Sequence, residues 1–555
     1  MSRLSRRELL AGAIGASAGL LSGCEGGLKT LPREGEILAP NYSIGHRIRD
    51  GFRPRPASDR WQETDVVVVG GGISGLAAAW RLRREGLERF VVLELESAAG
   101  GTSRSGKSSL TAYPWGAHYI PVPMPENRPL IAILREIGVI ERLDSDGAAV
   151  VAEQYLCRDP GERVFIDGIW HEGLYPSAGA TPRDLDELRQ FRAEIARWVA
   201  WRDGKGRRAF AIPVSASSDE LEVTSLDSIS MSEWIRRQGW NSPRLLWLID
   251  YSCRDDYGST SAQTSAWAGL FYFASRVRSA GGESQSLITW PEGNGRLVQH
   301  FTDRVRAQLR CGLAVVDVAT KKIRDTQSVE VRAVDVQTGE AVGFRARRAV
   351  FAAPQFLAPY LIDELPEDRK RNARQFEYSP WLVANLHLRE RPHERGFPLS
   401  WDNVLYDSRS LGYVTATHQT GIDYGPTVLT WYSALCDDGS SDVARQASIA
   451  RHKLFDMTWP EAAEIVLSDL ERAHPDIRTL VERLDVMKWG HAMIRPRTGF
   501  IWSEARRAAA TPFGPIHFAS TDLSGVALCE EAVYHGVRAA EETLRGLGRS
   551  VSSLV

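Results

Sequence analysis

A strand, a glycine-rich turn and a helix follow one another at residues 65–82, and this run constrains the fold most strongly. Four valines follow Asp65 without a polar interruption, as expected of a buried parallel strand. Residues 70–75 read GGGISG, which is the pattern G-x-G-x-x-G, and an alanine-rich helix-forming stretch comes next. This order predicts the dinucleotide-binding βαβ unit of an α/β fold.

The three motif glycines have different physical roles. The first permits a tight turn, the second lets the backbone approach a pyrophosphate, and the third lets the helix pack against the strand. The helix N-terminus then faces the phosphates. We expect cofactor contacts at Gly70, Gly72, Ile73, Ser74 and Gly75.

An acidic residue follows at the spacing that such a unit requires. Residues 90–93 form a second apolar strand that ends at Glu94, 19 positions after Gly75. An acid at this distance binds ribose hydroxyls. Strand, motif, helix, strand and acid in this order favour a bound dinucleotide over the alternative, a glycine-rich turn without a nucleotide.

Four later segments carry a family pattern. They are a second glycine pair at 100–101, the sequence WGAHYI at 115–120, the turn WPEGNG at 290–295, and a strand ending in an acid at 516–522 before a helix. Together with the first motif, these segments resemble flavin-dependent amine oxidases and their phytoene desaturase-like and protoporphyrinogen oxidase-like relatives. The resemblance implies a Rossmann-type FAD-binding domain interleaved with an α+β substrate-binding domain, an α/β fold overall.

The resemblance also assigns further cofactor contacts. It implies FAD contacts at Gly100, Gly101, Gly116, Ala117, Asp522 and Ala532. Many amine oxidases place an arginine directly after the glycine pair, whereas here Thr102 stands there and Arg104 is the expected pyrophosphate contact. The closing helix would point its positive end at the flavin pyrimidine, which becomes negative on reduction.

The order of these segments predicts two domains built from separated pieces. We expect the FAD-binding domain at 61–120, 285–365 and 495–548. The substrate domain would then consist of residues 121–284 and 366–494.

Two features depart from many amine oxidases. Those enzymes commonly hold a lysine that bridges through water to flavin N5, and the matching segment 378–385 has none. Only Lys488 lies in a segment expected near the flavin, and a surface lysine is its alternative interpretation. No cysteine precedes the closing motif, and Cys529 is interpreted as a packing residue. We therefore expect noncovalent FAD.

Three side chains are candidates for catalysis. His118 belongs to the segment that resembles the one beside the flavin. Tyr257 follows Asp255 and Asp256 at a helix junction, where these groups would orient a substrate amine or hydroxyl, or form a cap and a solvated turn. His491 would act as a base or tune the redox potential, or is a core histidine. No metal site is predicted.

The N-terminus predicts export. Arg6 and Arg7 precede an apolar run that is too short to cross a bilayer, the layout of a twin-arginine signal, with a Sec signal as the alternative. Residues 21–24 read LSGC and resemble a lipobox in which Cys24 receives a lipid. We expect a signal peptide at 1–23, a lipid-anchored linker at 24–60 and a periplasmic or cell-envelope lipoprotein.

Composition narrows the class of protein. With 68 basic and 70 acidic side chains, the formal charge of −2 argues against a nucleic-acid binder. The resemblance implies an FAD-dependent oxidoreductase that transfers hydride from a C–N or C–H bond of a small or lipid-like substrate to flavin N5, with oxygen or an electron carrier as acceptor. A desaturase- or isomerase-like enzyme and a non-catalytic flavin-binding assembly protein are the alternatives. The closing flavin motif argues against an NAD-dependent dehydrogenase.

Overall fold

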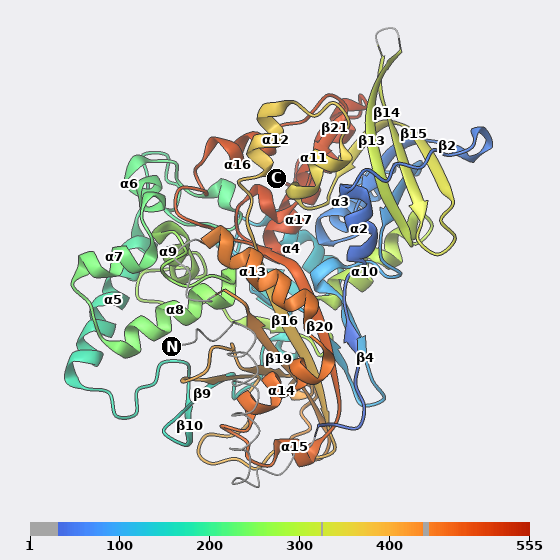
Figure 1. The fold of residues 1–555 in the computed structure, drawn as a ribbon. Coiled ribbons are helices and arrows are strands. Elements are labelled where there is room, and N and C mark those ends of the chain that lie inside the picture. The colour runs from blue at the N-terminus through green and yellow to red at the C-terminus, as the bar shows by residue number, and fades with distance from the viewer. Residues whose placement is uncertain (1–30, 324–325, 437–442) are drawn as a thin grey trace, which may run out of the picture.

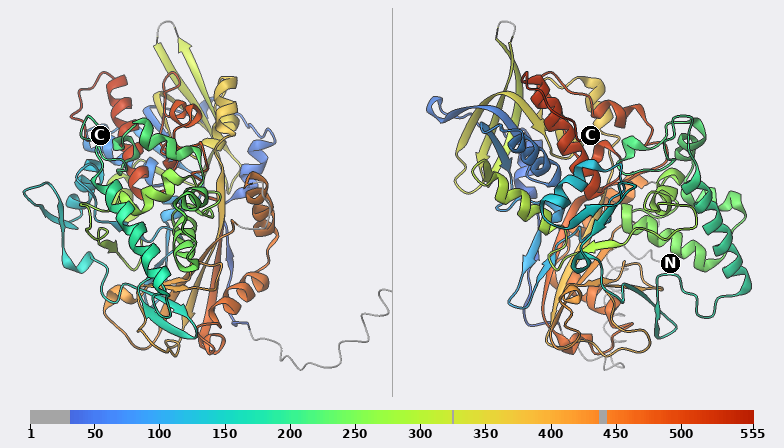
Figure 2. Two further views of the ribbon diagram at one scale, coloured as in Figure 1. Left: turned by 90° about the vertical axis from the view of Figure 1, so that its left-hand side faces the viewer. Right: turned by 180° about the vertical axis from the view of Figure 1, so that it is seen from behind.

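Two large sheets organise the protein, one of seven strands and one of eight. The computed structural model describes residues 31–323, 326–436 and 443–555. In Figure 1 the seven-stranded sheet lies at the upper right, the eight-stranded sheet at the lower centre, and a cluster of helices at the left. The view from behind in Figure 2 shows the same three parts with the helical cluster on the right. This arrangement confirms the predicted α/β fold class.

The seven-stranded sheet contains the predicted dinucleotide unit. Its strands are β2 (Trp61–Val69), β3 (Phe90–Glu94), β12 (Leu309–Cys311), β13 (Leu313–Ile323), β14 (Thr326–Asp335), β15 (Ala341–Phe351) and β21 (Ile516–Phe518). The strand order is β12-β3-β2-β15-β14-β13, with β21 beside β15, and the pairs around β2 and β3 are parallel. Val66 and Val68 face one apolar core and Val67 and Val69 the other, which explains the unbroken valine run.

Helices cover this sheet and meet each other closely at one point. The principal helices are α3 (Ile73–Arg84), α4 (Arg128–Glu136), α10 (Gly295–Val305) and α17 (Cys529–Gly546). A Cβ on Gly536 of α17 would lie 2.3 Å from the Ser74 carbonyl oxygen, so only glycine permits this approach of α17 to α3. The helix of the glycine motif is therefore fixed by a helix from the far end of the chain.

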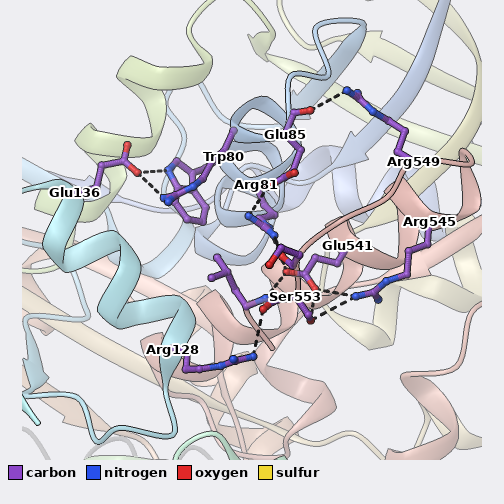
Figure 3. A network of polar contacts seen from close by, with 12 residues as sticks. Trp80, Arg81, Glu85, Arg128, Glu136, Glu541, Arg545, Arg549 and Ser553 are labelled. Atoms are coloured by element: carbon purple, nitrogen blue, oxygen red, sulfur yellow. Dashed lines mark hydrogen bonds and ion pairs between the residues drawn. The ribbon is translucent and has the colours of Figure 1, made fainter. Parts of the chain in front are cut away.

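A buried ion pair strengthens the contact between α3 and α17 (Figure 3). Arg81 lies 3.1 Å from Glu541, and both side chains are almost fully buried. Glu541 also accepts hydrogen bonds from the Leu554 amide (2.8 Å) and the Ser553 hydroxyl (2.6 Å). The residues after α17 thus provide hydrogen bonds to Glu541, the buried carboxylate that pairs with Arg81 of α3.

The eight-stranded sheet is mixed and forms the second layer of the molecule. Its strands are β1 (Ile37–Leu38), β9 (Glu162–Ile166), β10 (Ile169–Glu172), β16 (Tyr378–Leu388), β17 (Asp402–Leu405), β18 (Tyr413–Thr415), β19 (Thr427–Ala434) and β20 (Val481–Ile494). Their order is β1-β20-β16-β19-β18-β17-β9-β10. One face of this sheet packs against helices α13 (Val443–Asp456), α14 (Trp459–Leu470) and α15 (Ile477–Leu480). The other face packs against Tyr113 and Trp115, close to the predicted cofactor segments.

The helical cluster has an aromatic core of its own. It consists of α5 (Pro182–Ala200), α6 (Leu221–Thr224), α7 (Met231–Gln238), α8 (Pro243–Tyr257) and α9 (Ala266–Ala274). Trp198, Phe210, Trp234 and Trp267 are buried within it. The remaining short elements are β4 (Ser105–Lys107), β5 (Ala112–Pro114), β6 (Tyr119–Pro121), β7 (Ile140–Leu143), β8 (Ala149–Val151), β11 (Leu287–Thr289), α11 (Ala358–Leu361), α12 (Glu367–Ala373) and α16 (Glu504–Ala509).

Residues 31–60 correct one expectation, because the sequence predicts a linker there. Ile37 of β1 pairs in parallel with Val486 of β20. Helix α2 (Tyr42–Arg49) buries Ile44 and Ile48, which are one helical turn apart, against the core of the seven-stranded sheet. The prolines and glycines of this stretch therefore flank packed elements. The predicted signal peptide and Cys24 lie outside the described residues, and no described helix is long and apolar enough to span a membrane.

Candidate cofactor and substrate site

The glycine turn has the geometry that its motif predicts. Gly70 has a positive φ of 102°, and its amide donates to the Leu93 carbonyl oxygen (2.9 Å). A Cβ on Gly75 would lie 1.9 Å from the Gly70 carbonyl oxygen, so no larger residue fits. By contrast, apart from its two chain neighbours, no described residue has an atom within 4 Å of the Cβ position of Gly72, the N-cap of α3. The helix N-terminus is therefore open on the side where a pyrophosphate would bind.

Glu94 is held by backbone donors at the end of β3. Its two carboxylate oxygens accept hydrogen bonds from the Gly71 amide (2.7 Å) and the Glu96 amide (2.8 Å), and burial raises the pKa of its carboxyl group. Ile73 and Ser74 are buried in the first turn of α3. The acid predicted to bind ribose is thus fixed directly beside the glycine turn.

The second glycine pair packs onto the first turn. The Gly100 amide donates to the Gly71 carbonyl oxygen (2.8 Å), and Gly100 and Gly101 both have positive φ angles. The Arg104 guanidinium lies 5.3 Å from the Trp489 ring centroid, and its buried Nε has no hydrogen-bond partner among the described residues. Buried donors are normally satisfied, so this orphaned nitrogen fits the phosphate oxygens of a dinucleotide.

Backbone contacts continue from this loop into the Gly-Ala-His segment. The Trp115 amide donates to the Arg104 carbonyl oxygen, and the Ala117 amide to that of Thr102, both at 3.0 Å. A Cβ on Gly116 would lie 2.4 Å from the Thr102 carbonyl oxygen. The segments at 70–75, 100–104 and 115–118 therefore form one continuous surface.

His118 stands at the end of this surface. Its Nδ1 donates to the Gly116 carbonyl oxygen (2.9 Å), and burial lowers the pKa of the imidazole to about 4. The ring is therefore neutral at pH 7, with Nε2 as the acceptor nitrogen. Its centroid lies 5.1 Å from that of Tyr432 and 5.6 Å from that of Trp401, which both belong to the eight-stranded sheet region.

Asp522 and His491 lie together at the other end of the predicted flavin site. Asp522 accepts hydrogen bonds from the Gln355 amide (2.7 Å) and the Tyr378 hydroxyl (2.5 Å), and burial raises its pKa. The His491 ring stacks on Phe356 at 4.4 Å, and burial lowers its pKa to about 3. His491 is therefore a neutral side chain near the predicted ribityl contact.

Ala532 is buried in the first turn of α17, whose N-terminus has no side-chain cap. Uncapped amides at a helix N-terminus favour a negative ligand, as expected beside a reduced flavin. This end of α17 therefore fits its predicted role.

Tyr257 lies away from the other candidates. Its side chain is fully buried in the helical core, where the hydroxyl donates to the Ala268 carbonyl oxygen (2.8 Å). The neighbouring Asp256 forms an ion pair with Arg276 at 2.9 Å and accepts a hydrogen bond from Tyr119 at 3.3 Å. The junction is therefore packed and not a solvated turn, and the Tyr257 hydroxyl is bonded to a backbone carbonyl, because successive helical residues point in different directions.

Lys488 points away from the face that carries the site. Its Nζ donates to the carbonyl oxygens of Phe455 (2.8 Å) and Met457 (2.9 Å). Strand alternation places Trp489 on the opposite face, where its indole donates to the Trp115 carbonyl oxygen (2.7 Å). This placement agrees with a structural lysine.

Sequence reasoning missed several polar groups beside His118. Asp402 begins β17 and is only 6% exposed, with Tyr251 and Tyr432 as its hydrogen-bond donors. Glu162 begins β9 on the adjacent strand. The one available signal was an acid at the start of an apolar strand, which is weak because such acids are usually solvated.

The comparisons with known proteins agree with this geometry. A model of the flavin containing amine oxidoreductase family matches residues 73–544. An L-amino acid dehydrogenase from Synechocystis sp. is 24% identical over 485 residues, which are 83% of this chain and 90% of that protein.

Two solved structures share the fold. Cyclohexylamine oxidase from Brevibacterium oxydans has a TM-score of 0.60 at 17% identity, over 88% of this chain and 100% of that chain. A fatty acid isomerase from P. acnes has a TM-score of 0.59 at 14% identity, over 87% of this chain and 98% of that chain. The predicted FAD cofactor and oxidoreductase class are therefore confirmed, and the chain belongs to the family of flavin-containing amine oxidoreductases.

Proposed function

We propose that this oxidoreductase takes hydride from a C–N or C–H bond of a small or lipid-like substrate and passes the electrons to oxygen or an electron carrier. Bound FAD supplies the hydride acceptor, flavin N5. The observation that carries the proposal is the continuous contact path from the glycine turn through Gly100 and Ala117 to His118. This path connects a cofactor surface directly to an aromatic wall formed by Trp401 and Tyr432.

The chain's own residues have separable roles in this proposal. Gly72 and Arg104 would hold the pyrophosphate, Glu94 the ribose and Asp522 the ribityl chain. His118 would present a neutral Nε2 toward the substrate, because its Nδ1 is fixed by the Gly116 carbonyl. The aromatic wall would exclude water and position the reacting carbon.

The same proposal includes noncovalent FAD. Burial raises the pKa of the Cys529 thiol, which makes it a poor nucleophile at neutral pH. Acid denaturation followed by filtration tests this point. We expect the yellow flavin in the filtrate, and flavin that stays with the protein would contradict it.

The activity is tested on purified holoprotein under anaerobic conditions. We expect the visible band of oxidised flavin to bleach with at least one member of a panel of amines, amino acids and unsaturated lipids. A product with a moved or new C=C bond would instead favour a desaturase- or isomerase-like enzyme. If no compound bleaches the flavin and the photoreduced flavin reacts with no acceptor, a binding role replaces the proposal.

Export and tethering form a separate part of the proposal. The sequence pattern around Arg6, Arg7 and Cys24 supports the twin-arginine route and a lipid anchor. We expect replacement of both arginines by lysine to retain the precursor in the cytoplasm. Cys24→Ser should release the exported protein from membranes, and an unchanged distribution in either variant would contradict that part.

A further inference from the structure

Helix α17 carries a second buried glutamate besides Glu541. Glu531 lies in the first turn of the helix, directly before the predicted flavin contact Ala532, and its side chain is fully buried. Glu541 pairs with Arg81, whereas Glu531 forms no ion pair with another described residue. A buried carboxylate without a paired cation is costly, and such groups gather at functional sites.

Hydrogen bonds connect Glu531 to a buried histidine. One carboxylate oxygen accepts a hydrogen bond from the Val214 amide (2.7 Å), and the other accepts one from the Ser524 hydroxyl. The Ser524 oxygen also lies 2.7 Å from Nε2 of His535, which follows Glu531 by one helical turn. All three side chains are buried. We call Glu531, Ser524 and His535 the α17 relay.

The direction of these hydrogen bonds follows from Arg538, the next polar residue on this face of α17. Its Nε donates to Nδ1 of His535 at 3.4 Å, so Nδ1 is an acceptor and Nε2 carries the hydrogen. Burial lowers the pKa of His535 well below its usual range, which keeps the ring neutral. The Nε2–H group donates to Ser524, and the Ser524 hydroxyl donates to Glu531. Both donors therefore point toward the carboxylate, as proton transfer to Glu531 requires.

Glu531 lies close to the midpoint between its two protonation states at neutral pH. Burial raises the pKa of its carboxyl group to about 7, against the hydrogen bonds from Ser524 and Val214. Two neighbouring charges also contribute, because Glu530 of the same turn raises this pKa and Arg506 of α16 lowers it. The Arg506 guanidinium itself donates to backbone carbonyl oxygens. A further negative charge near this turn would therefore protonate Glu531.

Reduction of bound FAD introduces such a charge. A hydride carries two electrons and one proton, so its transfer leaves a net negative charge on the flavin. The predicted contact at Ala532 would place this charge at the N-terminus of α17, which favours negative groups through the helix dipole. Glu531 occupies the same helix end, and two negative charges there disfavour each other. Its affinity for a proton should therefore rise on reduction.

We propose that Glu531 takes up one proton from solvent when bound FAD accepts a hydride, and that Ser524 and His535 deliver this proton. The Ser524 hydroxyl proton moves to the carboxylate, and the Nε2 proton of His535 moves to Ser524. A solvent proton then binds Nδ1 when the long hydrogen bond from Arg538 opens. The imidazole stays neutral, and the neutral Glu531 compensates the negative charge that the hydride brings. This inference rests on hydride transfer to FAD in the proposed function, whichever bond the hydride leaves.

The pH dependence of the flavin reduction potential counts the protons. Holoprotein is equilibrated anaerobically with a reference dye of known potential between pH 8 and pH 9, where Glu531 of the oxidised protein is ionised. Each proton taken up with two electrons changes the potential by about 30 mV per pH unit. We expect about two protons for the parent protein and about one for Glu531→Gln, which keeps the size of the side chain. Equal proton numbers in the parent and this variant would overturn the proposal.

Glu504→Gln is the matched control, because Glu504 is an exposed glutamate in the first turn of α16. This control should take up as many protons as the parent protein, and an equal drop in both variants would overturn the assignment to Glu531. Infrared difference spectra of photoreduced and oxidised holoprotein locate the proton. We expect the band of a protonated carboxyl group in the parent and its absence in Glu531→Gln. The same band in both proteins would overturn the proposal.

His535→Leu tests the delivery of the proton and leaves Glu531 in place. After a light pulse that reduces the flavin, the carboxyl band should form several-fold more slowly than in the parent and reach the same final amplitude. An unchanged rate would overturn the α17 relay. Thermal melting and flavin absorbance show whether each variant folds and binds FAD, and His535→Leu decides the proposal if Glu531→Gln loses the cofactor.

Photoreduction needs no substrate, so these results separate the inference from the proposed function. If a compound of the panel bleaches the flavin but Glu531→Gln leaves the proton number unchanged, the function stands and the α17 relay fails. If the proton number falls as expected but no compound bleaches the flavin, the α17 relay stands and the proposed reaction fails.

Discussion

The glycine turn at residues 70–75 and a group of three acidic side chains differ in how the fold builds them. Glu162 and Asp402 are register partners on β9 and β17, and Asp255 lies in the last turn of α8. We call these three residues the carboxylate cluster. The turn offers backbone amides to a phosphate. A phosphate can approach these amides because Gly72 has no side chain. The carboxylate cluster consists of side-chain carboxyl groups that β9, β17 and α8 bring together. The structure of the turn depends on the path of the backbone, whereas the carboxylate cluster depends on three side chains that can be replaced.

This difference predicts which substitutions the fold tolerates. Any side chain at Gly75 meets the Gly70 carbonyl oxygen, so the turn cannot change without moving the strand and helix beside it. Asp402 and Asp255 can lose their charge without losing their shape. Cofactor binding should therefore fail together with the local fold, whereas neutral isosteres of the two aspartates should leave the fold intact.

The largest effect is expected at the turn. Gly75→Ala forces a Cβ to within 1.9 Å of the Gly70 carbonyl oxygen and should abolish FAD binding. Flavin absorbance per mole of purified protein is the measurement. Gly45→Ala in α2 is the matched control, because no atom lies within 4 Å of its Cβ position. The control should retain FAD and gain about 0.5–1 kcal/mol of stability from helix propensity. A Gly75→Ala protein with full FAD content would show that the turn also tolerates substitution, as the carboxylate cluster is expected to do.

The second effect concerns the helix that presents the turn. Arg81→Leu removes the buried arginine from Glu541, which keeps only the half-exposed Arg545 at 3.1 Å as an ion-pair partner, and should lower the free energy of unfolding by about 3 kcal/mol. Urea denaturation of the holoprotein measures this change. Arg83→Leu on the same helix removes an exposed pair with Glu88 and should cost less than about 1 kcal/mol. Similar losses in both variants would show that burial of the Arg81 pair has little energetic importance.

The two regions also differ in how much the sequence predicts. The turn, Glu94 and the Gly-Ala-His segment are recognisable because their function depends on short, contiguous stretches. The carboxylate cluster joins residues at 162, 255 and 402, which only strand pairing and helix packing bring together. No local pattern contains that information, so the sequence draws attention to Asp255 beside Tyr257 but not to Glu162 or Asp402.

The packed segment at 31–60 illustrates the same limit. Its prolines and glycines are typical of a linker. Residues 37–38 are a strand only because they pair with β20, about 450 residues later in the chain. Local composition therefore predicts a spacer where long-range pairing builds an edge strand.

A smaller effect should appear in the pH dependence of stability. The pKa of Asp255 is about 7 in the folded protein, raised by burial and then by Asp256, with Glu162 adding to the rise and Arg276 and Arg254 opposing it. The folded protein therefore holds a proton that the unfolded chain has released, from about pH 4 up to about pH 7. This group makes the protein less stable as the pH rises through that window.

Asp255→Asn should remove that contribution. We expect the free energy of unfolding of the ligand-free variant to fall less between pH 5 and pH 8 than that of the parent protein. Each unit by which the fold raises the pKa corresponds to about 1.4 kcal/mol. Urea titrations at both pH values measure the difference, and exposed Asp146→Asn should follow the parent curve. Identical pH slopes in the Asp255→Asn variant and the parent would mean that the fold does not raise the pKa of Asp255.

The smallest effect is expected at Lys488, which follows both regions in the sequence and lies on the face of β20 that contacts Phe455 and Met457. Its Nζ is already committed to the carbonyl oxygens of Phe455 and Met457, and the strand turns Trp489, not Lys488, toward Trp115. Lys488→Met should therefore cost about 1 kcal/mol of stability or less and leave the rate of anaerobic flavin bleaching by a reactive amine within about twofold. Stopped-flow absorbance gives that rate. A large loss of rate with unchanged stability would place the lysine in the chemistry.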